Sequence, residues 1–116
     1  MTLLGIKKRV WIFLINHVYV GTKHFDKKVI LMRKLGHEIG EGTKIVGPIY
    51  CTGKIIIGKD CWIGKNLIIN GNGSVRIGDN CDVAPEVSFQ TGGHEIGGAK
   101  RRAGKGKVYH ITVGNG

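Results

Sequence analysis

One histidine stands among glycines late in the chain, in the stretch FQTGGHEIGG at residues 89–98. An imidazole titrates close to neutral pH, so the side chain of His94 is suited to take up or return a proton during a reaction. The neighbouring glycines allow a ligand to approach the backbone closely. This pattern favours general-base catalysis, in which a base is held beside its substrate.

A strongly basic segment follows this histidine. Residues 96–110 contain no acidic side chain, and their cations are Lys100, Arg101, Arg102, Lys105 and Lys107. Lysine and arginine bind phosphate through charge-assisted hydrogen bonds. We expect the segment to meet phosphate groups of a cofactor or substrate; the alternative is a solvated loop that only keeps the protein in solution.

The net charge of the chain also favours an anionic ligand. Eighteen Lys and Arg against eight Asp and Glu give a net charge of +10. Such a surface attracts polyanions. No zinc-finger spacing or ladder of aromatic residues on basic strands accompanies it, so we do not expect a nucleic-acid partner. A phosphorylated small molecule is the better match.

The three cysteines are not arranged for catalysis or metal binding. Cys51, Cys61 and Cys81 form no Cys-x-x-Cys pair, which argues against a disulfide framework and a structural zinc site. We expect Cys61 and Cys81 to stack as core thiols in a reducing compartment, and we expect the protein to be cytoplasmic.

The elements that must position these side chains repeat every six residues. Aliphatic or similar residues recur at this interval from Ile39 to Ile69 and, after a slip of two residues, from Ile77 to Phe89. Neither a helix nor strand alternation gives this period, whereas the hexapeptide repeat of a three-sided parallel β-helix does. The anchors should point to the axis and stack from coil to coil.

The same repeat predicts where each coil begins. We expect coils at 39–56, at 57–76 and from residue 77, with the two extra residues bulging at a corner near 70–74. A small residue follows many anchors, and we expect it at corners where the backbone takes conformations that are costly for other residues. These small residues are Gly40, Gly58, Gly64, Gly78 and Ala84.

Residues 1–38 lack the repeat and are expected to be helical. The segment FDKKVILMRKLG reads as a short helix with Asp26 as its N-cap and Gly36 at its end. These helices should cap the open end of the coil. A second interpretation, compatible with the first, is a basic amphipathic segment that rests on an anionic membrane surface as a peripheral contact. The apolar run at 10–15 is too short to cross a bilayer, which takes roughly 20 residues.

The repeats carry a family resemblance. The units IGEGTKI, IGKDCWIG and IGDNCDVAPEVSF, followed by TGGHEIG, resemble the hexapeptide-repeat acyltransferases. The likeness is to the branch of galactoside and maltose acetyltransferases and of O-acetyltransferases of polysaccharide synthesis. It covers residues 39–116 well and residues 1–38 loosely. It implies an all-β fold, a left-handed parallel β-helix, assembled as a homotrimer with active sites between subunits.

The resemblance also implies a reaction and its residues. Acetyl-CoA would be the donor, a hydroxyl of a sugar or polysaccharide precursor the acceptor, and His94 the general base. We expect Asn72, at a position where the family's sugar enzymes have aspartate, and Glu95 to contact the acceptor. Gly64 stands where those enzymes carry an asparagine. No metal is expected, and the cations expected to bind coenzyme A are Arg101, Arg102, Lys105 and Lys107.

Residues 92–110 interrupt the repeat, and we expect them to form an active-site loop that reaches over a neighbouring subunit. The sequence ends at ITVGNG, where a fourth coil has just begun; in the family several further coils follow and contact coenzyme A. We therefore expect a fragment or a shortened relative. One alternative is a non-catalytic trimeric scaffold. Another is a metal enzyme like the γ-class carbonic anhydrases, which would need three histidines where only His94 and His110 stand near.

Overall fold

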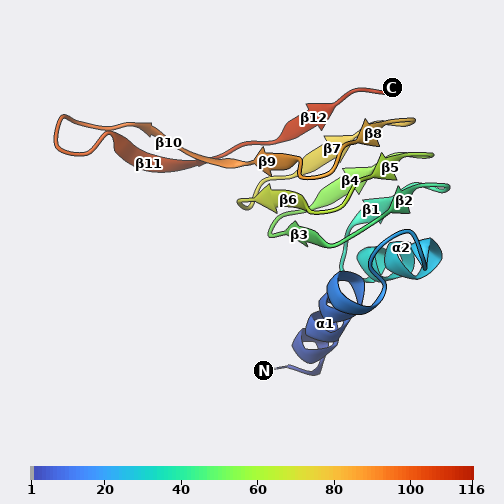
Figure 1. The fold of residues 1–116 in the computed structure, drawn as a ribbon. Helices are drawn as coiled ribbons and strands as arrows, with labels where there is room; N and C mark the ends of the chain where they lie inside the picture. The colour runs from blue at the N-terminus through green and yellow to red at the C-terminus, as the bar shows by residue number, and fades with distance from the viewer. Residues whose placement is uncertain (1) are drawn as a thin grey trace.

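The computed structural model describes residues 2–116, and most of its elements are short strands that follow an N-terminal pair of helices (Figure 1). The helical elements are α1 (Leu3–Phe13), the π-helical η1 (Leu14–Val18) and α2 (Phe25–Lys34). The strands are β1 (Glu38–Ile39), β2 (Lys44–Ile45), β3 (Ile49–Cys51), β4 (Ile55–Ile57), β5 (Trp62–Ile63), β6 (Leu67–Asn70), β7 (Val75–Ile77), β8 (Asp82–Val83), β9 (Ser88–Gln90), β10 (Gly92–Ile96), β11 (Ala103–Val108) and β12 (Ile111–Val113).

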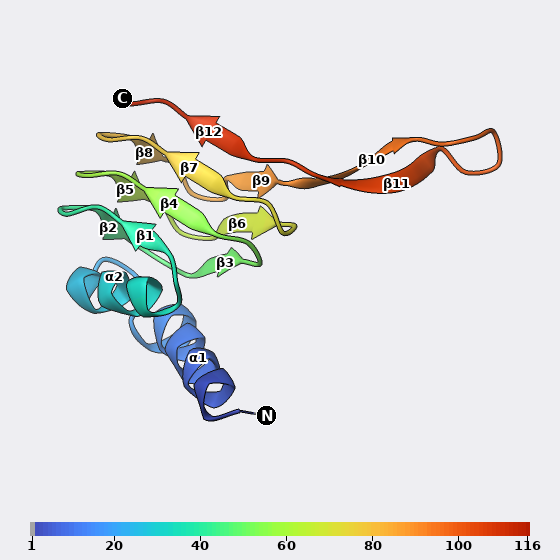
Figure 2. The ribbon, with the colours of Figure 1, turned by 180° about the vertical axis from the view of Figure 1, so that it is seen from behind.

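Three parallel sheets form the sides of the body. Their strand orders are β1-β4-β7-β12, β2-β5-β8 and β3-β6-β9. The chain visits the three sheets in turn and returns to the first, so it climbs as a stack of coils (Figures 1 and 2). This arrangement is consistent with the predicted β-helix, and the left-handed sense of its winding stays a prediction.

The anchors of the repeat stack as expected. Ile39 pairs with Ile57, which in turn pairs with Ile77 on the next coil. On the second side Ile45 pairs with Ile63, and both side chains are fully buried. Because each apolar side chain lies on its counterpart, the core runs as a continuous column along the axis.

The two extra residues lie at a corner, also as predicted. Ile49 pairs with Leu67, whereas Ile69 pairs with Phe89, two residues farther along the chain. The difference arises between β6 and β7, where Gly71 turns the backbone with a φ of +96°. The insertion therefore leaves the stacking of the sheets intact.

The glycines after the anchors serve a different purpose from the one expected. Gly58 does not have the left-handed φ that favours glycine; instead, a Cβ there would lie 2.8 Å from the carbonyl carbon of Gly78 on the next coil. Gly64 is confined in the same way, with a Cβ 2.6 Å from the Pro85 nitrogen. The left-handed positions of the corners are taken by other residues, among them Gly42, Asp60, Asn66, Asn80 and Glu86. Glycine is needed here because successive coils approach too closely for a side chain.

The helix α2 lies against the first coil, where the cap was predicted. It contacts β1 and β2, and its buried side chains join the core. It ends as expected at Gly36, whose N–H donates to the Arg33 carbonyl while the His37 N–H donates to the Met32 carbonyl. The prediction for its start was wrong: the N-cap is His24, in a left-handed conformation, and Asp26 lies inside the first turn.

Lys28 joins α2 to the body in a way that the sequence did not indicate. Its side chain is fully buried, and its Nζ donates hydrogen bonds to the carbonyls of Gly21 (2.6 Å) and Val46 (2.8 Å). The ammonium also lies 4.8 Å from the centre of the Phe25 ring. Burial lowers the pKa of Lys28 from its ordinary value of 10.5 to about 8.

Residues 92–110, expected as a loop, form an antiparallel hairpin instead. Strands β10 and β11 pair only with each other and project far from the coil (Figures 1 and 2). After the hairpin the chain returns as β12, which pairs with β7 in parallel and so continues the first sheet. The interruption of the repeat thus produces a two-stranded arm rather than an irregular segment.

Within the described residues 2–116, none of the helices has both the length and the apolar character that crossing a membrane requires.

Candidate active site on the projecting hairpin

The hairpin is fixed to the coil at its base by Thr91. This side chain is fully buried, and its hydroxyl donates to the Asn70 carbonyl (2.8 Å) and accepts the Gly73 N–H (3.1 Å). The returning strand is held at the same point, because the Tyr109 N–H donates to the Thr91 carbonyl (2.7 Å). Both ends of the hairpin are therefore tied to the corner that carries the insertion.

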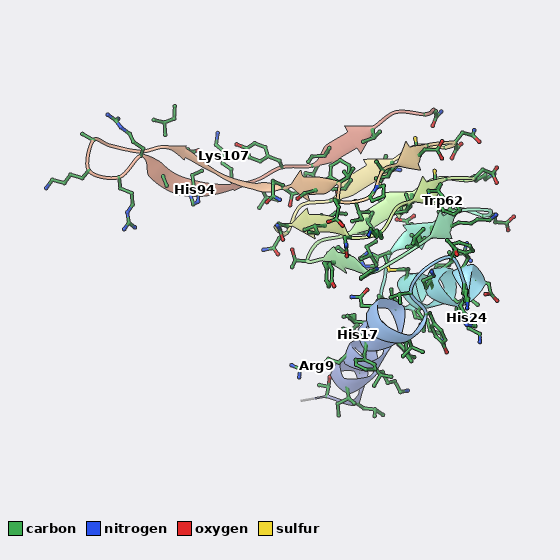
Figure 3. The ribbon with its side chains drawn as sticks, viewed as in Figure 1. Arg9, His17, His24, Trp62, His94 and Lys107 are labelled. Atoms are coloured by element: carbon green, nitrogen blue, oxygen red, sulfur yellow. The ribbon has the colours of Figure 1, made fainter. Side chains whose placement is uncertain are left out.

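His94 lies on β10 of this arm, exposed to solvent (Figure 3). Its Nδ1 is 3.1 Å from the carbonyl oxygen of Gly104 on β11. A carbonyl oxygen can only accept a hydrogen bond, so this contact places the proton of the neutral ring on Nδ1. The Nε2 atom then keeps a free lone pair, as a general base requires.

The surface around the imidazole is built from glycine. Gly106 lies directly opposite His94 on β11, and a Cβ there would meet its first neighbour, the Gly93 carbonyl oxygen, only at 4.0 Å. Gly92, two residues before His94 and on the same face, has nothing within 4 Å of such a Cβ. The face that presents His94 therefore offers open space for a substrate.

The opposite face of the arm carries the lysines. Lys107 pairs with Gly93, so strand alternation places it on the side away from His94, as Figure 3 also indicates. Lys105, two residues earlier on β11, shares that side, and all these side chains are exposed. Glu95 follows His94 directly and lies at the irregularity of pairing between His94 and Ile96, and the imidazole Nδ1 is engaged by the Gly104 carbonyl. One hairpin thus presents its base and its lysines to different sides.

Arg101 and Arg102 lie in the turn between the two strands, at the far end of the arm. Both are exposed, and the Arg102 guanidinium donates a long hydrogen bond of 3.5 Å to the Gly97 carbonyl. Asn72 is exposed at the corner of the insertion, where the hairpin begins. The structure therefore spreads the predicted site residues along the arm, from Asn72 at its base to the arginines at its tip.

His110, the other histidine near the hairpin, is engaged at the same corner. Its Nδ1 accepts the backbone N–H of Ser74 (3.1 Å) and lies 2.8 Å from the Ser74 hydroxyl. The backbone donor requires Nδ1 to be unprotonated, so the hydroxyl also donates to it. Sequence spacing did not predict this contact, because Ser74 precedes His110 by a whole coil.

The cysteines are core residues. Cys61 and Cys81 are buried in neighbouring coils, as predicted, and their thiols donate to the carbonyls of Gly78 (3.0 Å) and Gly114 (3.1 Å). Burial raises the pKa of Cys51 to about 11, although His37 Nε2 lies 3.4 Å from its sulfur. Across residues 2–116, no group of three or more His, Cys, Asp or Glu side chains is placed to hold a metal ion.

Two hollows in the structure lie at the helical cap. The first, of about 420 Å³, is lined by Ile12, Met32, Tyr50 and their neighbours, and the second, of about 400 Å³, lies beside α2. Neither borders the hairpin. The face that presents His94 is an open surface in a single chain, so an enclosed site there would need a second wall.

Comparison with known proteins points to one class of enzyme. The chain is 30% identical over 92 residues to the galactoside O-acetyltransferase of Escherichia coli (strain K12), a match that covers 78% of the chain and 45% of that protein. It is 31% identical over 115 residues to a Saccharomyces cerevisiae protein named "Putative acetyltransferase", covering 97% of the chain and 59% of that protein. The chain is similar to acetyltransferases over most of its length.

The chain spans about half the length of the curated relatives that it matches. No protein-family model matches it, and no solved structure matches it.

Proposed function

We propose that the protein is an O-acetyltransferase that moves an acetyl group from acetyl-CoA to a hydroxyl of a sugar or polysaccharide precursor, with His94 as the general base. One observation carries this proposal. The imidazole stands on a glycine-lined face with Nδ1 engaged by the Gly104 carbonyl and Nε2 free. The names of the related proteins suggest the reaction type, since both contain the word acetyltransferase.

In the proposed reaction His94 handles one proton. Nε2 accepts the proton of the acceptor hydroxyl as its oxygen attacks the thioester carbonyl. The C–S bond then breaks, and the coenzyme A thiolate leaves with the proton from the imidazolium. The products are the acetyl ester and free coenzyme A. General-base catalysis contributes about 10²–10⁴-fold, so holding the two substrates in line must supply much of the rest.

The second wall of the site is proposed to come from another copy of the chain in a homotrimer. The arm carries large apolar side chains in solvent: Ile96 is 90% exposed and Val108 is 56% exposed. An arm that extends beyond its own coil can lie against a neighbour and enclose the surface in front of His94. This assembly would also explain why one hairpin can present His94 and its lysines to two different sides.

The remaining expectations are part of the same proposal. Asn72 and Glu95 contact the acceptor, and the phosphates of coenzyme A meet Arg101, Arg102, Lys105 and Lys107. The coil winds left-handed, and the enzyme works in the cytoplasm. Support for the cofactor assignment comes from the exposure of these cations and the absence of acids at 96–110.

The test is acetyl transfer by the purified chain from labelled acetyl-CoA to a panel of sugar acceptors. We expect labelled ester on at least one sugar, together with an equal amount of free thiol. Titration calorimetry with coenzyme A supplies the control. Absence of both ester formation and saturable heat would contradict the enzymatic proposal and favour a non-catalytic scaffold. The scaffold is considered because the chain matches only 45% and 59% of the lengths of these relatives.

A further inference from the structure

The helix α1 carries an apolar stripe that the body leaves uncovered. None of its residues is buried, and it extends away from the coil in both views (Figures 1 and 2). At about 100° per residue, Leu3, Ile6, Val10 and Phe13 fall within about 80° of arc, so they form one line along the helix. Their exposed fractions lie between 48% for Ile6 and 69% for Leu3.

The stripe lies on a different side of α1 from Trp11, which meets the body. The side of α1 that meets the body is marked by Trp11, which packs against the core with the Lys34 ammonium 5.8 Å from its ring centre. Ile12 lines the hollow beneath the first coil. Both residues lie about 120° or more around the helix from the middle of the stripe. The described chain therefore leaves the stripe uncovered.

Cations border this stripe, and no acid opposes them. Lys7 and Arg9 lie about 40° outside its two edges, on opposite sides, and both are exposed. The first acidic residue of the chain is Asp26. A protein partner of mixed charge would meet only positive charge here, whereas a surface of phosphate and carboxylate groups would complement both edges at once.

We propose that α1 is a docking surface for an anionic phospholipid bilayer. The helix would lie in the plane of the interface, with the stripe of Leu3, Ile6, Val10 and Phe13 among the acyl chains. Lys7 and Arg9 would extend from its edges to the lipid phosphates, as long basic side chains do at such boundaries. This docking would hold the enzyme against a membrane while the coil and its arm remain in water.

The test uses flotation of the full chain with phosphatidylcholine vesicles, with and without phosphatidylserine. We expect binding to the anionic vesicles and at least tenfold weaker binding to the neutral ones. The double substitution Lys7→Glu/Arg9→Glu should weaken anionic binding about tenfold or more, because both cations that would meet the lipid phosphates become anions. Ile6→Ser/Val10→Ser should weaken it to a similar extent.

The matched control is Lys105→Glu/Lys107→Glu, which changes the net charge equally but on the hairpin. It should retain at least half of the wild-type binding. Equal loss in this control would show general charge attraction and would overturn the proposal. Binding to neutral vesicles as tight as to anionic ones, or no binding to either, would also overturn it. So would sedimentation showing that the stripe substitutions dissociate an assembly of the chain, since the occupant would then be a second copy.

Discussion

The imidazole of His94 is oriented by a carbonyl ten residues away in the sequence and directly across a hairpin in space. The sequence singled out the histidine and its glycine neighbours. It could not identify Gly104, because the register of an antiparallel pair depends on the turn and on a bulge between His94 and Ile96.

The face that presents His94 has open space at Gly106, directly opposite on β11. Gly106→Val should lower kcat/KM at least tenfold, because the new side chain occupies the face on which a substrate would approach. The melting temperature should not fall, since a Cβ at this position has no neighbour closer than 4.0 Å. Steady-state kinetics and thermal unfolding measure both effects. Gly98→Val, an equally open position in the turn, is the control and should retain full activity.

Lys28 gives a prediction of pH dependence. Its folded-state pKa of about 8 lies below the ordinary 10.5, so in this range the unfolded chain binds the proton more tightly. Raising the pH from about 7 to about 9 should therefore stabilise the wild type by about 1 kcal/mol relative to Lys28→Met. Denaturant unfolding of both proteins at each pH measures the difference between their free energies of unfolding. The same cysteines titrate in both proteins, so their contributions cancel in this difference. A difference that stays flat or falls would contradict this assignment.

At the scale of elements, the coil was predictable and the arm was not. A period of six specifies stacked anchors, and Ile39, Ile57 and Ile77 align as expected because any other register would expose an apolar column. The arm follows no such period, since its strands pair with each other and expose nearly every side chain. The tight stacking of Gly58 on Gly78 also lay beyond the sequence, because it depends on the distance between coils.

The anchor of the arm can be tested through Thr91. Thr91→Val keeps the shape but leaves the buried Gly73 N–H without its partner, which should cost about 1–3 kcal/mol of unfolding free energy. Activity should fall as well, because the base of the hairpin loosens. Thr52→Val is the matched control: Thr52 donates a similar hydrogen bond to the Gly71 carbonyl but is exposed, so its loss should cost well under 1 kcal/mol. Equal costs in the two variants would contradict the role given to Thr91.

At the scale of the whole molecule, the proposed trimer would bring another chain against the arm. The sequence suggested a trimer through its family resemblance, and the structure adds a reason of its own in the side chains that the hairpin leaves in water. Ile96, at 90% exposure, is the clearest of them.

Assembly can be measured by native mass spectrometry. We expect the wild type to be a trimer and Ile96→Lys to shift it toward the single chain, because a charge would be forced into the contact. Ile30→Lys adds the same charge at a 49% exposed position on α2 and should leave the trimer intact. A wild-type protein that is monomeric at the concentrations where it is active would contradict the shared site.

We propose that His94 acts as the base in acetyl transfer. The most direct measurement is the rate of ester formation from labelled acetyl-CoA by His94→Ala, with His17→Ala, another exposed histidine, as the control. We predict a loss of about 10²–10⁴-fold for His94→Ala with unchanged circular dichroism and melting temperature, and full activity for His17→Ala. A folded His94→Ala protein that transfers acetyl groups at the wild-type rate would contradict the account.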